Sequence, residues 1–237
     1  MQTTSNLYKQ IVASSGHYFE TKISIAGHEL AESQIISLER DAQTMTQSKP
    51  SVGGALSATL SLTILAQSFS IPRMAEIDVY VRARNSSSTS EWLPAGVFFI
   101  DTREHDQTVN GVGVLKIEAY DAMMKAEADY PDTDHSWPYL DKNVVAEIAS
   151  TIGATVDSRT NGFLTASYMI DLPMGYTMRE TLEHIAAAYA GNFVITAENK
   201  LLFIPLYGLD PDVTGRYLAD ENGNALVFGN ERWYILV

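Results

Sequence analysis

The sequence contains no cysteine, which excludes disulfide bonds, thiol catalysis and cysteine-ligated zinc or iron–sulfur sites. Basic residues are also scarce, since 16 lysines and arginines stand against 29 acidic residues and the formal net charge is −13. Binding to nucleic-acid phosphates requires a surplus of positive charge, so a nucleic-acid-binding function is not expected. The acidity is spread along the chain, with net charges of −4 for residues 1–128, −6 for 129–208 and −3 for 209–237.

Long hydrophobic runs are missing as well. Polar residues interrupt the most apolar stretch, residues 56–66, which is too short to span a bilayer. The first ten residues have no apolar core, so neither a secretory signal nor a membrane anchor is expected. The chain is nevertheless 46% hydrophobic over 237 residues, which suffices for one large globular domain or two small ones.

A two-residue period dominates residues 19–128 and predicts antiparallel strands. The clearest strand is 56–66, where apolar residues alternate with a hydroxyl-bearing face made of Ser57, Thr59, Ser61 and Thr63. Further strands are predicted at 19–25, 34–39, 77–82, 92–101 and 112–120, with a hairpin turn at Ala26-Gly27. Strands without helices between them indicate an antiparallel barrel or sandwich, and closure into a barrel would remove exposed edges.

Residues 129–208 change to a helical period. Apolar residues between Val144 and Ile152 predict a helix with Asp141 as its N-cap and Gly153 after its end. A second helix is predicted by the capping-box spacing of Thr177 and Glu180, with Gly191 in the C′ position. Strands are predicted at 166–172, 193–196 and 201–206, and these elements together form a small two-helix α+β domain.

The sequence thus predicts a mainly β protein with an added α+β part. We expect an N-terminal arm at 1–18, an antiparallel β-barrel domain at 19–128, the α+β domain at 129–208, and a C-terminal hairpin and tail at 209–237, with strands at 216–219 and 225–228. The tail ends in an apolar run that requires a partner surface in its own chain or in a neighbour. The candidate subunit-interface residues are Trp233, Tyr234, Ile235, Leu236 and Val237.

Patterns that would indicate catalysis or metal binding are weak. The five histidines do not form a metal-binding spacing. Residues 132–135 (Asp-Thr-Asp-His) group three ligand types, but they lie in a proline-flanked stretch without a second ligand cluster, which favours a solvated loop. Ser14 is close to His17 in the sequence, but a polar linker is a better interpretation of this stretch than a catalytic triad. The glycines of 52–55 are better interpreted as a backbone bend than as a phosphate-binding loop.

Carboxylate pairs, such as Asp101 with Glu104 and Glu118 with Asp121, are expected by chance in an acidic chain. We therefore predict no catalytic, cofactor-binding or metal-binding residues, and no enzymatic activity. Two other classes stay open, a cell-wall hydrolase accessory and a carbohydrate-binding module. The second would use exposed aromatic residues such as Trp92 or Trp137.

Several segments, in order, resemble the central hub proteins of phage tail tips and baseplates. Residues 56–64 resemble the first long barrel strand of that family, and 92–101 are similar to its W-x-P-x-G-x-F-x-(I/V)-D strand. Residues 115–123 follow at the expected distance and resemble its I-x-A-Y-D-x-M segment, and 175–192 resemble its second helix. Residues 201–205 fit its closing strand, although Asn199 replaces a glycine, so the resemblance covers about residues 19–207.

This resemblance implies a structural role, as a hub subunit that lines the end of the tail tube and joins it to the distal tip. The implied assembly is a ring, with a trimer favoured. Only one barrel is evident where larger members carry two, so either a second barrel is disguised, another protein supplies it, or the ring is a hexamer. The implied partners are tail tube and distal tail proteins and a spike or fibre protein, while genomic DNA only passes through the lumen. The implied location is the virion, after assembly in the host bacterial cytoplasm, and no cofactor is implied.

Overall fold

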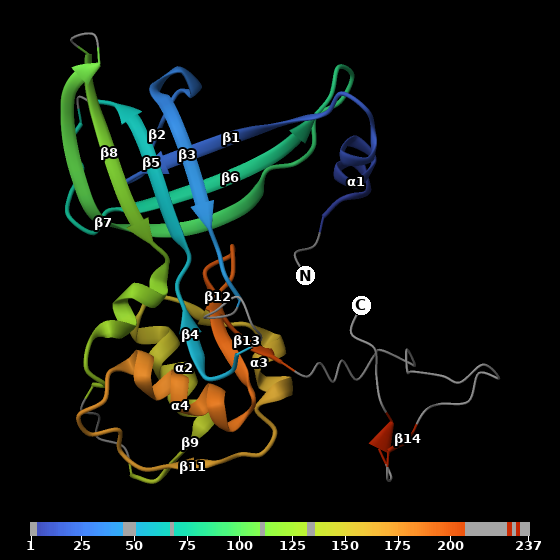
Figure 1. Cartoon of the computed structure of the whole chain (residues 1–237), viewed down its shortest axis with the longest axis vertical. Helices are drawn as coiled ribbons and strands as arrows, with labels where there is room; N and C mark the ends of the chain where they lie inside the picture. Colours follow the sequence, from blue (N-terminus) through green and yellow to red (C-terminus); the bar gives the residue numbers. More distant parts are fainter. Residues whose placement is uncertain are drawn as a thin grey trace.

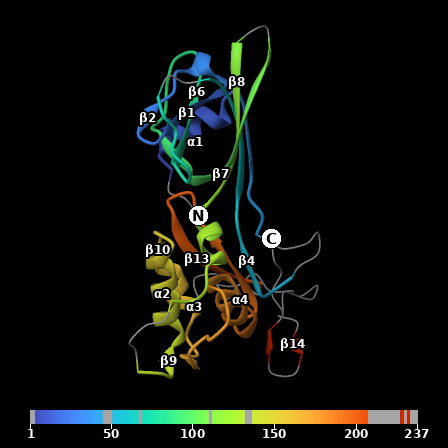
Figure 2. The ribbon, with the colours of Figure 1, turned by 90° about the vertical axis from the view of Figure 1, so that its left-hand side faces the viewer.

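The computed structural model describes residues 4–44, 51–66, 69–109, 112–131, 136–206, 227–228 and 231–232. It consists of a sheet unit and an α+β unit, stacked along the long axis of the molecule (Figures 1 and 2). The sheet unit contains α1 (Asn6–Ala13), β1 (Tyr18–Ile25), β2 (His28–Glu29), η1 (Glu32–Gln34), β3 (Ile35–Asp41), β5 (Thr59–Leu65), β6 (Glu76–Arg84), β7 (Leu93–Val109) and β8 (Val112–Tyr120). The α+β unit contains β4 (Gly54–Leu56), η2 (Ala122–Glu127), β9 (Tyr139–Leu140), α2 (Asp141–Thr151), β10 (Thr155–Val156), α3 (Ser158–Phe163), β11 (Met169–Ile170), α4 (Met178–Ala188), β12 (Gly191–Ile195) and β13 (Lys200–Pro205).

The sheet unit is built on one antiparallel sheet of seven strands, in the order β2-β1-β6-β7-β8-β5-β3. The sheet curls into a half-barrel (Figure 1). Leu60, Leu62 and Ile64 are fully buried on its inner face, and the hydroxyl-bearing residues between them are half-buried on the other face. This confirms the predicted alternation and the mainly β fold class. The strand order ends at β2 and β3, so the half-barrel keeps two edges.

The α+β unit packs its helices on a four-stranded sheet with the order β10-β13-β12-β4. Its core is separate from that of the sheet unit and centres on Phe193 and Phe203, whose rings lie 5.2 Å apart. The predicted capping box at the start of α4 is present, because Thr177 accepts a hydrogen bond from the Glu180 backbone and the Glu180 side chain accepts one from the Thr177 backbone. The predicted strands 193–196 and 201–206 are confirmed as the hairpin β12–β13.

Two predicted cap positions are wrong. Leu140 is the N-cap of α2, and Asp141 is its first residue, where the buried carboxylate accepts hydrogen bonds from the backbone N–H groups of Lys142 and Tyr168. At the end of α4, Ala190 takes the left-handed conformation with a φ of 52°, and Gly191 already begins β12. Gly191 lacks a side chain for a different reason, since a Cβ there would lie 2.3 Å from the Phe203 ring.

Some elements were not predicted or lie elsewhere. Helix α1 occupies the predicted N-terminal arm and is capped by Ser5, which accepts a hydrogen bond from the Tyr8 N–H at 3.0 Å. Helix α3 adds a third, shorter helix to the α+β unit. Of the strand predicted at 166–172, only β11 forms. The predicted strand 216–219 lies outside the described residues, whereas β14 (Val227–Phe228) and β15 (Glu231–Arg232) pair as a hairpin.

Among the described residues, the chain passes between the two units in three places: from β3 to β4, from β4 to β5, and from β8 to η2. The predicted strand 56–66 is therefore divided, since β4 pairs in parallel with β12 in the α+β unit and β5 lies in the half-barrel. None of the helices in the described part is long and apolar enough to cross a membrane.

Candidate functional site at the junction of the two units

A buried carboxylate joins two of the three chain crossings. Asp121 lies at the end of β8, is 3% exposed, and is the N-cap of η2. Its oxygens accept hydrogen bonds from the Ala58 N–H at 2.7 Å, the Ser57 hydroxyl at 2.9 Å and the Met123 N–H at 3.0 Å. Burial raises the pKa of Asp121, and these hydrogen bonds partly counteract that effect. One side chain thus connects the β4–β5 link to the β8–η2 link.

Arg179 on α4 connects the same region from the other side. Its guanidinium donates hydrogen bonds to the backbone carbonyls of Ala55 on β4 and Met123 on η2, and its Nε lies 2.6 Å from a carboxylate oxygen of Glu127. The side chain is 20% exposed. Because planar guanidinium groups form several directed hydrogen bonds, Arg179 fixes α4 against both neighbouring elements.

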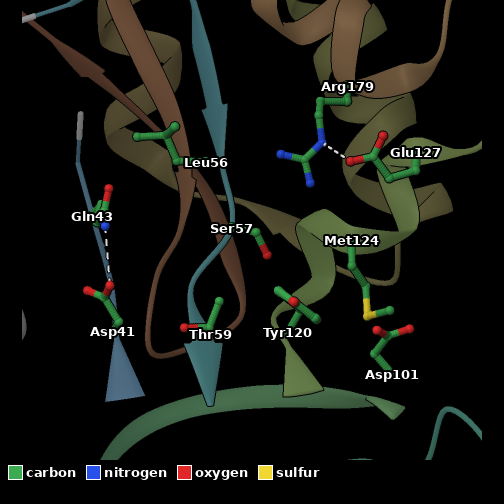
Figure 3. Close-up of a pocket in the computed structure, with 10 residues that line it drawn as sticks. All are labelled: Asp41, Gln43, Leu56, Ser57, Thr59, Asp101, Tyr120, Met124, Glu127 and Arg179. Atoms are coloured by element: carbon green, nitrogen blue, oxygen red, sulfur yellow. Dashed lines mark hydrogen bonds and ion pairs between the residues drawn. The ribbon is translucent and has the colours of Figure 1, made fainter. Parts of the chain in front are cut away.

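A cavity of about 520 Å³ is lined by Arg179 and by Ser57, the hydrogen-bond partner of Asp121 (Figure 3). Three of its residues form a row in register across neighbouring strands, because Asp41 on β3 is paired with Thr59 on β5, which is paired with Tyr120 on β8. Asp101 lies on the opposite side of the close-up from Asp41 (Figure 3). The lining residues are Asp41, Gln43, Leu56, Ser57, Thr59, Asp101, Tyr120, Met124, Glu127 and Arg179.

The cavity does not contain a serine–histidine pair. None of its ten lining residues is a histidine, and the Ser57 hydroxyl donates a hydrogen bond to the carboxylate of Asp121, which also accepts hydrogen bonds from the Ala58 and Met123 N–H groups. The described residues contain no group of three side chains that could hold a metal ion. The hydrogen bonds of Asp121 hold two of the chain crossings between the units together.

The structure explains most of the sequence candidates as local structure. The Ser14 hydroxyl donates a hydrogen bond to the Ile11 carbonyl at 2.6 Å, and the His17 Nδ1 lies 2.8 Å from the Ser14 carbonyl oxygen. Both side chains therefore contact the backbone at the C-terminal end of α1. Gly53 has a φ of +82° and forms the predicted bend before β4. Glu118 accepts a hydrogen bond from Ser61 at 2.8 Å on the sheet surface.

The remaining candidates do not gather at the junction cavity as a group. Asp101 lines the cavity, whereas Glu104 lies on the exposed part of β7. Residues 132–135 and the five candidate interface residues, 233–237, lie outside the described residues. The roles of Asp121 and Arg179 were not predicted, since Asp121 was considered only as one member of a carboxylate pair.

The two tryptophans proposed as carbohydrate platforms are engaged within the chain. The guanidinium carbon of Arg82 lies 4.3 Å from the ring centroid of Trp92, and the ammonium of Lys22 lies 5.4 Å from it. Trp137 packs edge-on between Tyr130 and Tyr139, at the margin of the α+β core. Cations on the ring and packing against the core are structural uses of these side chains.

Comparison with solved structures shows which proteins have this fold. A tail protein from Neisseria meningitidis MC58 superposes with a TM-score of 0.51 and 13% sequence identity, over 87% of this chain and 58% of that protein. The 43 kDa tail protein of prophage MuSo2 from Shewanella oneidensis superposes with a TM-score of 0.52 and 12% identity, over 80% of this chain and 56% of that protein. The chain shares its fold with these two tail proteins.

At these identities the likeness concerns the fold, and the chain spans less than two thirds of the length of either tail protein. No protein-family model matches the sequence. No curated protein matches it either.

Proposed function

We propose that this chain is a structural subunit of a phage or phage-like tail, a hub protein that lines the end of the tail tube and joins it to the distal tip. The observation that carries this proposal is the fold shared with two tail proteins over 87% and 80% of the chain. The junction supports a structural role, because its polar side chains bind one another and the backbone instead of forming a nucleophile–base pair. The chain is accordingly proposed not to be an enzyme and to need no cofactor.

The edges of the half-barrel supply a mechanism of assembly. On one side, β3 carries the exposed Ile36, which is 52% accessible, and pairs only with β5 among the described strands. On the other side, β2 covers β1 only at Ser24 and Ile25, so residues 18–22 of β1 pair with β6 alone. Unpaired backbone groups on such edges form hydrogen bonds with a strand of another chain.

Edge pairing between copies would place half-barrels side by side in a ring. We propose a trimer, with a hexamer as the alternative, and a second contact through the apolar residues 233–237. An obligate interface of this kind buries more than about 2,000 Å². The other proposed partners are the tail tube and distal tail proteins and a spike or fibre protein, in the virion. A net charge of −13 would keep DNA phosphates from adhering as the genome passes through the lumen.

The test is the solution mass of the purified chain by analytical ultracentrifugation, together with negative-stain images of any large species. We expect rings of three or six copies with a central hole. Ile36→Lys on the β3 edge should shift the population toward monomers, whereas the control Met74→Lys, at an exposed position (39%) between strands, should not. Rings that persist equally in both variants would contradict edge pairing, and a monomer at every concentration would contradict ring formation by this chain alone.

A further inference from the structure

Strands β9 and β11 lie at the end of the α+β unit away from the half-barrel (Figure 1), and exposed apolar side chains are concentrated in and just after β11. Among the described residues, ten large hydrophobic side chains are exposed, and four of them lie between residues 168 and 176. We call residues 168–176 the distal segment. Its exposed members are Tyr168 (47%), Met169 (58%), Met174 (79%) and Tyr176 (47%).

The backbone of the distal segment is held in place. Tyr168 exchanges two hydrogen bonds with Asp141, from its N–H to the carboxylate and from the Asp141 N–H to its carbonyl. Ile170 pairs with Tyr139 in the β9–β11 ladder, and the Tyr176 carbonyl accepts a hydrogen bond from the Tyr130 N–H at 2.9 Å. The apolar side chains are thus presented on a fixed backbone, which lowers the entropic cost of binding.

The charges around the distal segment are mostly negative, although the exposed Lys142 follows Asp141, which binds Tyr168. Residues 160–178 contain no lysine or arginine. Asp171 within the segment, Glu180 just after it, and Asp129, whose backbone is bridged to Thr177, are all exposed. The nearest basic residue in the sequence, Arg179, is engaged with Glu127 and two carbonyls. The surface therefore combines apolar contacts with an acidic border.

We propose that the distal segment is a docking surface for a different protein, one that presents apolar side chains bordered by lysine or arginine. The chain itself is a poor occupant, because a second copy docked through the same segment would bring Asp171 and Glu180 against their own counterparts, and residues 209–237 carry a net charge of −3. An anionic membrane is disfavoured for the same electrostatic reason. Methionine side chains adapt to the shape of a partner, which suits Met169 and Met174 to this contact. The proposal rests on exposure and charge and does not depend on ring formation.

The first experiment locates the occupant by photo-crosslinking in the full-length chain. Met174→p-benzoylphenylalanine places the photoreactive group on the distal segment, and Met74→p-benzoylphenylalanine is the control on the sheet unit. The probes are a short synthetic amphipathic peptide with leucines on one face and lysines beside them, and its twin with glutamates in place of the lysines. We expect an adduct only between position 174 and the lysine peptide. An adduct between two copies, an adduct with residues 207–237 of the same chain, or equal yields at both positions would overturn the proposal.

The second experiment measures the affinity of the labelled lysine peptide by fluorescence anisotropy. Met169→Ser with Met174→Ser should weaken binding by about tenfold or more, and the control pair Leu7→Ser with Met74→Ser, both exposed, should leave it unchanged. Asp129→Asn with Asp171→Asn should weaken binding and reduce its dependence on salt. All substituted residues are exposed, so folding should be retained, as circular dichroism would verify. Equal weakening by both serine pairs, or no binding of the lysine peptide, would refute the proposal.

Discussion

Removing the carboxylate of Asp121 should destabilise the whole chain, since it ties two crossings between the units. Asp121→Ala leaves the buried N–H of Ala58 without a partner, which costs about 1–3 kcal/mol. It also removes the N-cap of η2 at Met123, which costs about 1 kcal/mol. Relief of the buried charge offsets part of this loss, because burial raises the pKa of Asp121. We expect the free energy of unfolding to fall by about 3 kcal/mol at neutral pH.

The assay is urea unfolding followed by circular dichroism, combined with amide hydrogen exchange read by mass spectrometry. Exchange should become faster at the amides of Ala58 and Met123 before other parts of the chain respond. Glu118→Ala is the matched control, because that carboxylate also accepts a hydrogen bond from a serine but on the exposed surface, and it should change stability by less than about 0.5 kcal/mol.

Asp121→Asn separates the loss of charge from the loss of hydrogen bonds. The carboxylate accepts from two backbone N–H groups through different oxygens, and an amide offers one oxygen and one NH2 group. In either orientation a backbone N–H faces the amide nitrogen, so the asparagine variant should also be destabilised, despite removal of the buried charge. If the alanine and asparagine variants were both as stable as the Glu118→Ala control, the role assigned to Asp121 would be refuted.

Two further predictions test local features of the α+β unit. Gly191→Ala should lower stability by about 1–3 kcal/mol, because the new Cβ would lie 2.3 Å from the Phe203 ring and 2.4 Å from the Ile204 carbonyl oxygen. The control is Gly27→Ala, where nothing lies within 4 Å of the new Cβ and the only cost is that of the positive φ. Thermal melts of the two variants test this difference. The Arg159 guanidinium lowers the pKa of Asp157 to about 2, so Asp157 stabilises the fold above its ordinary pKa of 3.8, and this contribution is lost as the pH falls toward 2. Asp157→Asn should therefore cost about 1 kcal/mol at pH 7, and its denaturant midpoint should depend less on pH between 4 and 2 than that of the unmodified chain.

The sequence predicts best where burial follows a simple period. The alternation along 59–65 has the same spacing as the two faces of a strand, so the half-barrel strand could be read from it directly. The capping box of α4 was also predictable, because both of its hydrogen bonds depend on residues three positions apart. In these cases the structure depends on near neighbours in the sequence.

Prediction failed where a distant part of the chain determines the local structure. Strand 56–66 is divided because Asp121, more than sixty residues later, binds the backbone at Ala58. Asp141 is not a cap, because its carboxylate binds the N–H of Tyr168. Gly191 looks like a helix-ending glycine, but the space it leaves is required by Phe203 of the next strand. The junction cavity could not be predicted for the same reason, because its lining residues come from distant parts of the sequence.

The contacts at the junction also bear on the proposed role in a tail. A hub that joins a tube to a tip has to transmit position from one end to the other, so its two units should not move independently. Backbone links without side-chain contacts between them would allow rotation between the units. Asp121 binds the backbone of the β4–β5 and β8–η2 links, so rotation would break hydrogen bonds to buried groups, while Arg179 fixes β4 and η2 to α4 within the α+β unit. The two proposed docking regions, the edges of the half-barrel and the distal segment, are therefore held in a fixed relation by a side chain that neither region contains.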